Sequence, residues 1–394
     1  MVTTPAARPA GAERFIALDS LRGIAAISVM YYHMGDFGWV AGFTPFRSGW
    51  ILVDFFFILS GFVIAASYGA RLAHGYPRGG FLLVRLGRLY PLHIVTVALF
   101  VALEFLVFRP VLHESHSLSE LARGVFLFDA FVRGAGNFYA PVSWAVAVEL
   151  VVYILAAALF GRGRWAIAVA LGLAGASAWA LHSGFNVIGF SRLLQRGLLG
   201  FPLGVGCFWL HRRLLRVQPG AAVLSVAECG LLAAFVGLLW MPGKSAASIP
   251  LADALYAAMV LVLARDGGIA SRALQMRPLV RLGQLSFALY MVHLVFVILS
   301  NRFLPRVFAA AGHADWIRPG RNTFGLLRVA PPLWLATLIT LGLTALALMA
   351  AWLAWRFIEE PTRHWTRRLG PTTAPVAPQS GTFIPAQAPV SPGP

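Results

Sequence analysis

The sequence predicts an all-α fold, a polytopic membrane bundle of about ten transmembrane helices. Three observations lead to this prediction. Of the 394 residues, 59% are hydrophobic and only 12% are charged. The mean hydropathy of +0.74 is typical of a chain that lies largely within a membrane. The apolar residues form stretches of membrane-crossing length, and the short connections between them carry most of the arginines.

The first apolar stretch, Glu13–Met34, is long enough to cross a bilayer, yet it contains Asp19, Arg22 and His33. A charge in hydrocarbon is costly, so such residues usually face a protein interior. Arg22 and His33 are separated by about three full helical turns, which places them on one face at a distance of roughly 16 Å. Asp19 falls within about 40° of that face. We therefore expect a polar stripe that faces the interior of the bundle.

The chain divides into three parts. Residues 1–12 are rich in Pro and Ala and are predicted to be disordered, residues 13–368 form the membrane domain, and residues 369–394 form a flexible, Pro-rich tail. Within the domain the apolar pattern predicts spans near residues 15–34, 50–70, 86–108, 142–160, 164–182, 190–210, 221–240, 246–264, 281–300 and 332–357.

The formal net charge of +17 does not indicate nucleic-acid binding, because the arginines lie in short loops between apolar runs. More of these arginines fall on the side that holds the two termini, which predicts an inner (plasma) membrane protein with both termini in the cytoplasm. Cys207 and Cys229 lie in apolar segments and suggest neither a disulfide framework nor a metal site.

The second span contains Asp54 in the sequence WILVDFFFILSGF. In the expected topology Asp54 lies near the side of the membrane that His33 reaches, so the two side chains could meet. A carboxylate that orients an imidazole and raises its basicity is a common catalytic pairing. A structural hydrogen bond between adjacent helices is the commoner use of such a residue, and both interpretations stay open. Gly61 in LSGF favours close helix packing.

The third span begins with two arginines, Arg85 and Arg88, in VRLGRLYPLH. Residues three apart lie on one face of a helix. Two guanidinium groups in this arrangement suit a phosphate group. Anchoring of the span at the inner membrane surface is the alternative interpretation.

Two later spans each contain one buried ionisable residue. Glu149 lies well inside the fourth span, in APVSWAVAVELVVY, where a carboxylate must be paired, protonated or lined by water. His293 lies in LGQLSFALYMVHL, with Ser286 on nearly the same helix face. A packed, hydrogen-bonded histidine is the alternative to a functional one. The residues alone thus predict a polar interior that suits either a transporter or an intramembrane enzyme, built from Asp19, Arg22, His33, Asp54, Glu149 and His293.

Six motifs together resemble the acyltransferase-3 family of integral membrane O-acyltransferases. They follow the family's order and span most of the predicted membrane domain. They are RFIALDSLRGIAAISVMYYH with its Arg-x10-His spacing, VDFFFILSGFVI, RLGRLYPLH, SWAVAVEL, LGQLSFALYMVH and RFIEEP. The resemblance implies the stand-alone type, without the extracellular SGNH-type hydrolase domain that some members carry. Phe287 stands where a tyrosine is common in the family.

The resemblance implies transfer of an acyl group, usually acetyl, from cytoplasmic acyl-CoA to a hydroxyl group. The acceptor would be a cell-surface carbohydrate or a small molecule, and neither a permanently bound cofactor nor a metal is implied. The family's motif residues match six positions, which would be the catalytic histidine, its motif partner, two donor-binding arginines, and a further acid and histidine: His33, Arg22, Arg85, Arg88, Glu149 and His293.

This resemblance leads to a hypothesis in which the donor's phosphates bind Arg85 and Arg88 and its thioester reaches His33. His33 would act as general base on the acceptor hydroxyl, or would itself be acylated. The candidates for orienting its imidazole are Asp54, Glu149 and His293. The competing hypothesis is a membrane transporter of a sugar, a lipid-linked intermediate or a small metabolite.

Overall fold

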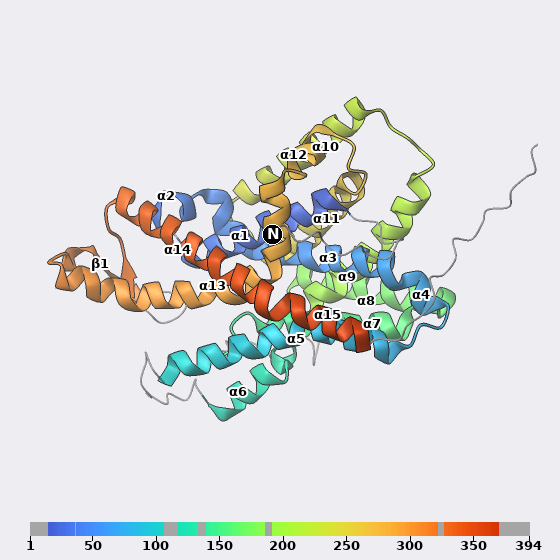
Figure 1. Ribbon diagram of the computed structural model, residues 1–394. Coiled ribbons are helices and arrows are strands. Elements are labelled where there is room, and N and C mark those ends of the chain that lie inside the picture. The colour runs from blue at the N-terminus through green and yellow to red at the C-terminus, as the bar shows by residue number, and fades with distance from the viewer. Residues whose placement is uncertain are drawn as a thin grey trace, which may run out of the picture.

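The computed structural model describes residues 15–35, 37–105, 117–132, 139–185, 191–321 and 327–369. The predicted disordered segment 1–12 and the predicted tail beyond residue 369 lie outside these residues. The described chain is helical apart from its connections and an antiparallel hairpin of β1 (Ile317–Arg321) and β2 (Leu327–Val329). The prediction of a helical bundle is therefore confirmed (Figure 1).

The helices of the described chain are α1 (Ile16–Met34), α2 (Gly38–Ala41), α3 (Leu52–Ile64), α4 (Ala70–Ala73), α5 (Arg78–Leu103), α6 (Leu118–Val125), α7 (Ser143–Leu159), α8 (Gly163–Ser183), α9 (Arg192–Leu214), α10 (Ala221–Trp240), α11 (Ile249–Leu263), α12 (Ile269–Leu274), α13 (Arg277–Ala310), α14 (Leu333–Ala354) and α15 (Glu360–Leu369). A 3₁₀ helix, Thr44–Ile51, leads into α3, and π-helical turns at Ala65–Gly69 and Trp355–Glu359 join α3 to α4 and α14 to α15.

By length and composition, eight helical segments of the described chain can cross a membrane. They are Thr44–Ala73, Arg78–Leu103, Gly163–Ser183, Arg192–Leu214, Ala221–Trp240, Ala246–Leu263, Arg277–Ala310 and Leu333–Leu369. The two remaining predicted spans also coincide with helices. α7 is apolar but has only 17 residues, and α1 has 19 residues with the polar stripe that lowers its mean hydropathy.

Two helices extend beyond their predicted spans. α13 has 34 residues where the apolar pattern predicts 281–300, and the last helix continues through a π-helical turn into α15. Hydropathy detects only the apolar part of a helix, so it does not predict the polar residues that extend the helix beyond the membrane. α15 packs beside α5, and Gly87 of α5 faces Thr366 of α15 without room for a further methyl group.

α1 packs along α13 through two glycines (Figure 1). A Cβ atom on Gly23 would come within 2.6 Å of the backbone nitrogen of Gly283. A Cβ atom on Gly283 would overlap the carbonyl oxygen of Asp19. Small residues allow two membrane helices to approach closely, and here they bring the polar stripe of α1 against α13.

α3 packs equally closely against α9. Side chains on Gly61 of α3 or Gly204 of α9 would overlap the carbonyl oxygens of Phe201 and Ile58, respectively. The prediction that Gly61 serves close packing is confirmed. α1, α3, α5, α7 and α13 together leave a cavity between them.

Candidate active site

A cavity opens between α1, α3, α5, α7 and α13 and holds about 760 Å³ of empty space, its open mouth included. Eight of its lining side chains are polar, namely Arg22, Ser60, Arg85, Arg88, Glu149, Tyr153, Ser286 and Tyr290. The other wall is apolar and includes Val53, Phe56, Phe57, Ile64 and Val146. Of the residues selected from the sequence, four line this cavity: Arg22, Arg85, Arg88 and Glu149.

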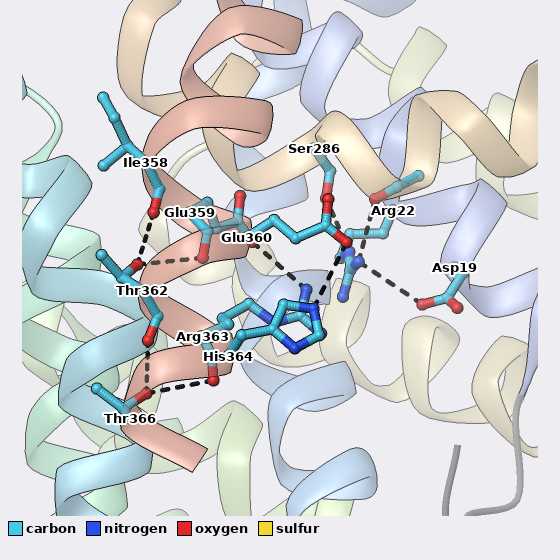
Figure 2. A network of polar contacts seen from close by, with 11 residues as sticks. Asp19, Arg22, Ser286, Ile358, Glu359, Glu360, Thr362, Arg363, His364 and Thr366 are labelled. Atoms are coloured by element: carbon cyan, nitrogen blue, oxygen red, sulfur yellow. Dashed lines mark hydrogen bonds and ion pairs between the residues drawn. The ribbon is translucent and has the colours of Figure 1, made fainter. Parts of the chain in front are cut away.

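Arg22 is held against α13 at the wall of the cavity (Figure 2). Its Nε donates a hydrogen bond to Ser286 Oγ at 2.8 Å, and its Nη2 donates to the carbonyl oxygen of Gly283 at 3.0 Å. Asp19 lies one turn earlier on α1, with a carboxylate oxygen 3.6 Å from Nη2. These contacts fix the guanidinium group in one orientation, so its positive charge is presented to the cavity from a defined position.

Arg85 and Arg88 form the cationic side of the cavity on α5. Arg85 is only 8% exposed, and its guanidinium carbon lies 4.7 Å from the ring centroid of Tyr68. Among the described residues, the Nε atoms of Arg85 and Arg88 have no hydrogen-bond partner. Buried guanidinium groups with unused donors, beside an aromatic ring, have the chemistry of an anion-binding site.

Glu149 lies on α7, and one of its carboxylate oxygens is shared by two hydroxyl groups. Tyr153 donates a short hydrogen bond to Oε1, and Ser60 Oγ donates to the same oxygen at 3.3 Å. Tyr153 stands one turn after Glu149, so its contact follows from helical spacing. Ser60 comes from α3, and sequence spacing on α7 gives no indication of it. The two hydroxyls orient the carboxylate at the cavity wall.

His33 and His293 meet at the end of α1. His293 Nε2 lies 3.1 Å from His33 Nδ1, and the two rings have centroids 5.0 Å apart. His293 is fully buried, and its Nδ1 lies 2.8 Å from the carbonyl oxygen of Tyr290. His33 Nδ1 also lies 2.9 Å from the carbonyl oxygen of Val29. α1 and α13 thus place the two predicted histidines in direct contact.

The backbone carbonyls determine which ring nitrogens carry protons. A carbonyl oxygen only accepts, so His293 Nδ1 donates to Tyr290 and, in the neutral ring, His293 Nε2 is left as an acceptor. His33 Nδ1 then donates to that nitrogen and to Val29. This assignment, made from the hydrogen-bond network, places the lone pair of neutral His33 on Nε2. His33 is thereby set up as a base through Nε2.

The histidine pair lies just beyond the cavity. The lining on α13 ends at Tyr290, about one helical turn before His293. Ser286, Tyr290 and His293 follow one another at spacings of four and three, which places them along one face of α13. That face runs from the Arg22 contact to the His33 contact, so it connects the cationic part of the cavity with the histidines.

Asp54 does not orient His33. It is fully buried, and its two carboxylate oxygens accept hydrogen bonds from Arg196 Nε at 2.8 Å and Nη2 at 3.0 Å. Arg196 Nη2 also donates to the carbonyl oxygen of Trp50 at 2.8 Å. The alternative of a structural bond between helices holds, with α9 in place of α1 as the partner. Asp54 and Arg196 are 142 positions apart, and a pattern within one helix cannot reveal such a pair.

The described residues contain no group of three or more His, Cys, Asp or Glu side chains that could hold a metal ion. The donor groups around the cavity are guanidinium and hydroxyl groups with a single carboxylate. This set suits an anionic organic ligand.

Comparisons with known proteins identify the family of the chain. The family model described as the acyltransferase domain of the acyltransferase-3 type matches residues 15–356. A curated protein, "Protein 2 in picA locus" of Rhizobium radiobacter, is 45% identical over 91 residues, which is 23% of this chain. The chain covers 46% of that relative, about half of its length. No solved structure matches the chain.

Proposed function

We propose, from the premise that the chain belongs to the acyltransferase-3 family of multi-pass membrane proteins, that it transfers an acyl group from cytoplasmic acyl-CoA to a hydroxyl group. The acyl group proposed is acetyl, and the acceptor is a cell-surface carbohydrate or a related molecule. The observation that carries the proposal is the His33–His293 pair, placed one turn beyond a cavity lined by arginines. The arginines of the cavity suit an anion, and the histidine pair suits proton transfer.

The donor is proposed to enter at the arginines. Arg85 and Arg88 offer unused buried donors to the phosphate groups of CoA, and Arg22 presents a third positive charge from α1. Arg22 and His33 are roughly 16 Å apart along α1. A CoA thioester carries its phosphates and its reactive carbonyl at opposite ends of a thin, flexible arm. The separation therefore allows the phosphates to bind the arginines while the thioester passes Tyr290 towards His33.

His33 is proposed to be the general base. Its Nε2 takes the proton of the acceptor hydroxyl while the hydroxyl oxygen bonds to the acyl carbon. The carbon–sulfur bond then breaks, and the proton held on Nε2 passes to the departing thiolate, so the step is balanced. His293 is a positioning residue, because its Nε2 accepts the Nδ1 proton of His33 and keeps the correct tautomer. A variant of the mechanism acylates His33 Nε2 first.

The proposed location is the inner (plasma) membrane, with both termini in the cytoplasm. The support is the excess of arginine on the side of the termini, including Arg363, Arg367 and Arg368 of α15. In this orientation the end of α1 at Ile16 lies on the cytoplasmic side, where the donor is. The end that carries His33 lies on the opposite side, where the acceptor is.

Inverted membrane vesicles supplied with labelled acetyl-CoA test the proposed function. The label is expected to become covalently attached to an acceptor, and free CoA is expected to accumulate. Movement of an unmodified acceptor across the membrane, without transfer of label, would instead establish the transporter alternative. Trapping of label on the protein itself would select the mechanism through acylated His33.

A further inference from the structure

A second polar cluster adjoins the arginines where α14 passes into α15 (Figure 2). Glu359 ends the π-helical turn and is only 2% exposed. Its Oε2 has no hydrogen-bond partner among the described residues. The other oxygen, Oε1, lies 3.9 Å from Nη1 of Arg363, one turn later. A buried carboxylate held this loosely is uncommon, because burial of a charge is costly unless the charge is paired.

Three arginines from three helices lie near this carboxylate. Arg22 of α1, Arg88 of α5 and Arg363 of α15 all lie within electrostatic interaction range of Glu359. Arg363 in turn lies within range of Arg22 and Arg88. Figure 2 shows Glu359 and Arg363 on the helix that runs from α14 into α15, beside the Arg22 contact with Ser286. Glu359 is thus the shared counter-ion of a group of positive charges.

The geometry of this cluster differs from that of a permanent structural ion pair. Asp54 and Arg196 form two hydrogen bonds of 2.8 and 3.0 Å, which is a close bidentate pair. Glu359 has one contact of 3.9 Å to Arg363 and leaves its Oε2 unused. The close pair holds α3 against α9. The loose pair leaves the arginines able to exchange one anion for another.

We propose that Arg363 belongs to the donor's phosphate site and that Glu359 is a resident anion that the phosphates displace. This inference rests on the proposed function, because it identifies the ligand of the arginines as a phosphorylated thioester. In the empty protein Glu359 balances Arg22, Arg88 and Arg363. A ligand with several phosphate charges replaces it, whereas an uncharged thioester does not compete for the arginines.

This arrangement makes the site selective. A thioester of pantetheine has the reactive end of acyl-CoA but no phosphate groups, so it gains nothing from Arg363. The resident carboxylate also repels any bound anion, which sets a minimum charge for the donor. α15 therefore contributes donor specificity, although it lies outside the helices that line the cavity.

Equilibrium binding of CoA and of pantetheine to the purified full-length protein in lipid vesicles tests the proposal. Arg363→Ala is expected to weaken CoA binding by about tenfold, because it removes one partner of a charged contact. Glu359→Gln is expected to tighten CoA binding by about threefold, because an uncharged amide of similar shape replaces the competing carboxylate. Binding of pantetheine should be the same in both variants as in the wild type.

Two neighbours on α15 provide matched controls. Glu360 pairs with His364 at 3.9 Å, so Glu360→Gln removes an adjacent carboxylate whose ion-pair partner is a histidine and not one of the three arginines. Arg368 is exposed, so Arg368→Ala removes a positive charge from the same helix. Both controls should bind CoA as the wild type does.

The proposal is overturned if Arg363→Ala binds CoA as tightly as Arg368→Ala does, or if Glu359→Gln weakens CoA binding. The second outcome would mean that Glu359 only orders the arginines. Equal changes for CoA and pantetheine would also overturn it, because the effect would then be structural. Failure of the proposed function is distinguishable. If the wild-type protein binds CoA through Arg363 but transfers no acyl group, the proposed transfer is refuted and the proposed phosphate site stands.

Discussion

At the scale of single residues, two ring nitrogens determine the chemistry. His293 Nδ1 is committed to the carbonyl oxygen of Tyr290, so its Nε2 must accept from His33. Without that acceptor, the Nδ1 proton of His33 retains the carbonyl oxygen of Val29 as its partner. His293 therefore only orients His33, so losing His293 should lower the rate less than losing the base itself would.

Substitution of His293 tests this orientation. His293→Leu removes the acceptor and is expected to lower kcat by about tenfold, well below the roughly 10⁴-fold loss that follows when a catalytic histidine takes the wrong tautomer. His293→Gln retains an oxygen that accepts a hydrogen bond and should restore part of the rate. The measurement is kcat as a function of pH for the three proteins, and the pH profile should shift in the Leu variant.

The control for this prediction is KM for acetyl-CoA, which should stay near the wild-type value in both variants. A Gln variant as slow as the Leu variant, with an unshifted pH profile, would show that His293 only fills space.

At the scale of helices, polar pairs and glycines fix the positions of the elements. Arg196 of α9 reaches Asp54 of α3, and the glycines of both helices allow the backbones to approach. A second buried carboxylate, Asp253 of α11, lies within electrostatic range of this pair, and neither of its oxygens has a hydrogen-bond partner among the described residues. The two carboxylates are equally buried but differ in their partners, so they should respond differently to the same substitution.

Asp54→Asn is expected to destabilise the protein by about 3–5 kcal/mol, because it leaves Arg196 buried without its counter-charge. Asp253→Asn should change stability by less than about 1 kcal/mol, because it removes no hydrogen bond or close ion pair of the described residues. Thermal unfolding of the two variants in the same detergent gives the comparison. Equal losses would contradict the different roles that the contacts assign to these residues.

The α1–α13 contact gives a second prediction at this scale. A methyl group at Gly283 would overlap the backbone of Asp19 and force α1 away from α13. Gly283→Ala is therefore expected to cost about 1–3 kcal/mol and to weaken the Arg22–Ser286 contact. Gly342 of α14 has open space around it, so Gly342→Ala should be neutral. Unfolding midpoints of the two variants decide this, and equal midpoints would contradict the close packing.

At the scale of the whole molecule, helical periodicity predicts which residues share a face of one helix, but it does not predict which helices are in contact. The polar stripe of α1 and the spacing of Arg85 and Arg88 follow from positions within one helix, and Arg22 of that stripe lines the cavity together with the two arginines of α5. The His33–His293 contact joins residues 260 positions apart, and Ser60 and Glu149 are 89 apart. Such pairings depend on which helices are neighbours, and hydropathy gives no information about that.

Of the two interpretations that the sequence leaves open for Asp54, the structural bond is the one found. Depth in the membrane placed Asp54 near His33, but a bundle offers several neighbours at each depth, and Arg196 provides the stronger partner. Glu359 was overlooked for a related reason. It lies at the end of an apolar helix, where a carboxylate resembles an ordinary surface residue until α15 is seen to pack beside α5.

The proposed mechanism has two separate parts: the donor binds at Arg22 of α1 and at Arg85 and Arg88 of α5, and His33 at the far end of α1 carries out proton transfer. The most direct test measures CoA binding and acyl transfer on one preparation of His33→Ala in lipid vesicles. The account predicts wild-type binding of CoA together with a loss of transfer of at least about 10²-fold. Transfer at the wild-type rate, or CoA binding lost together with transfer, would contradict it.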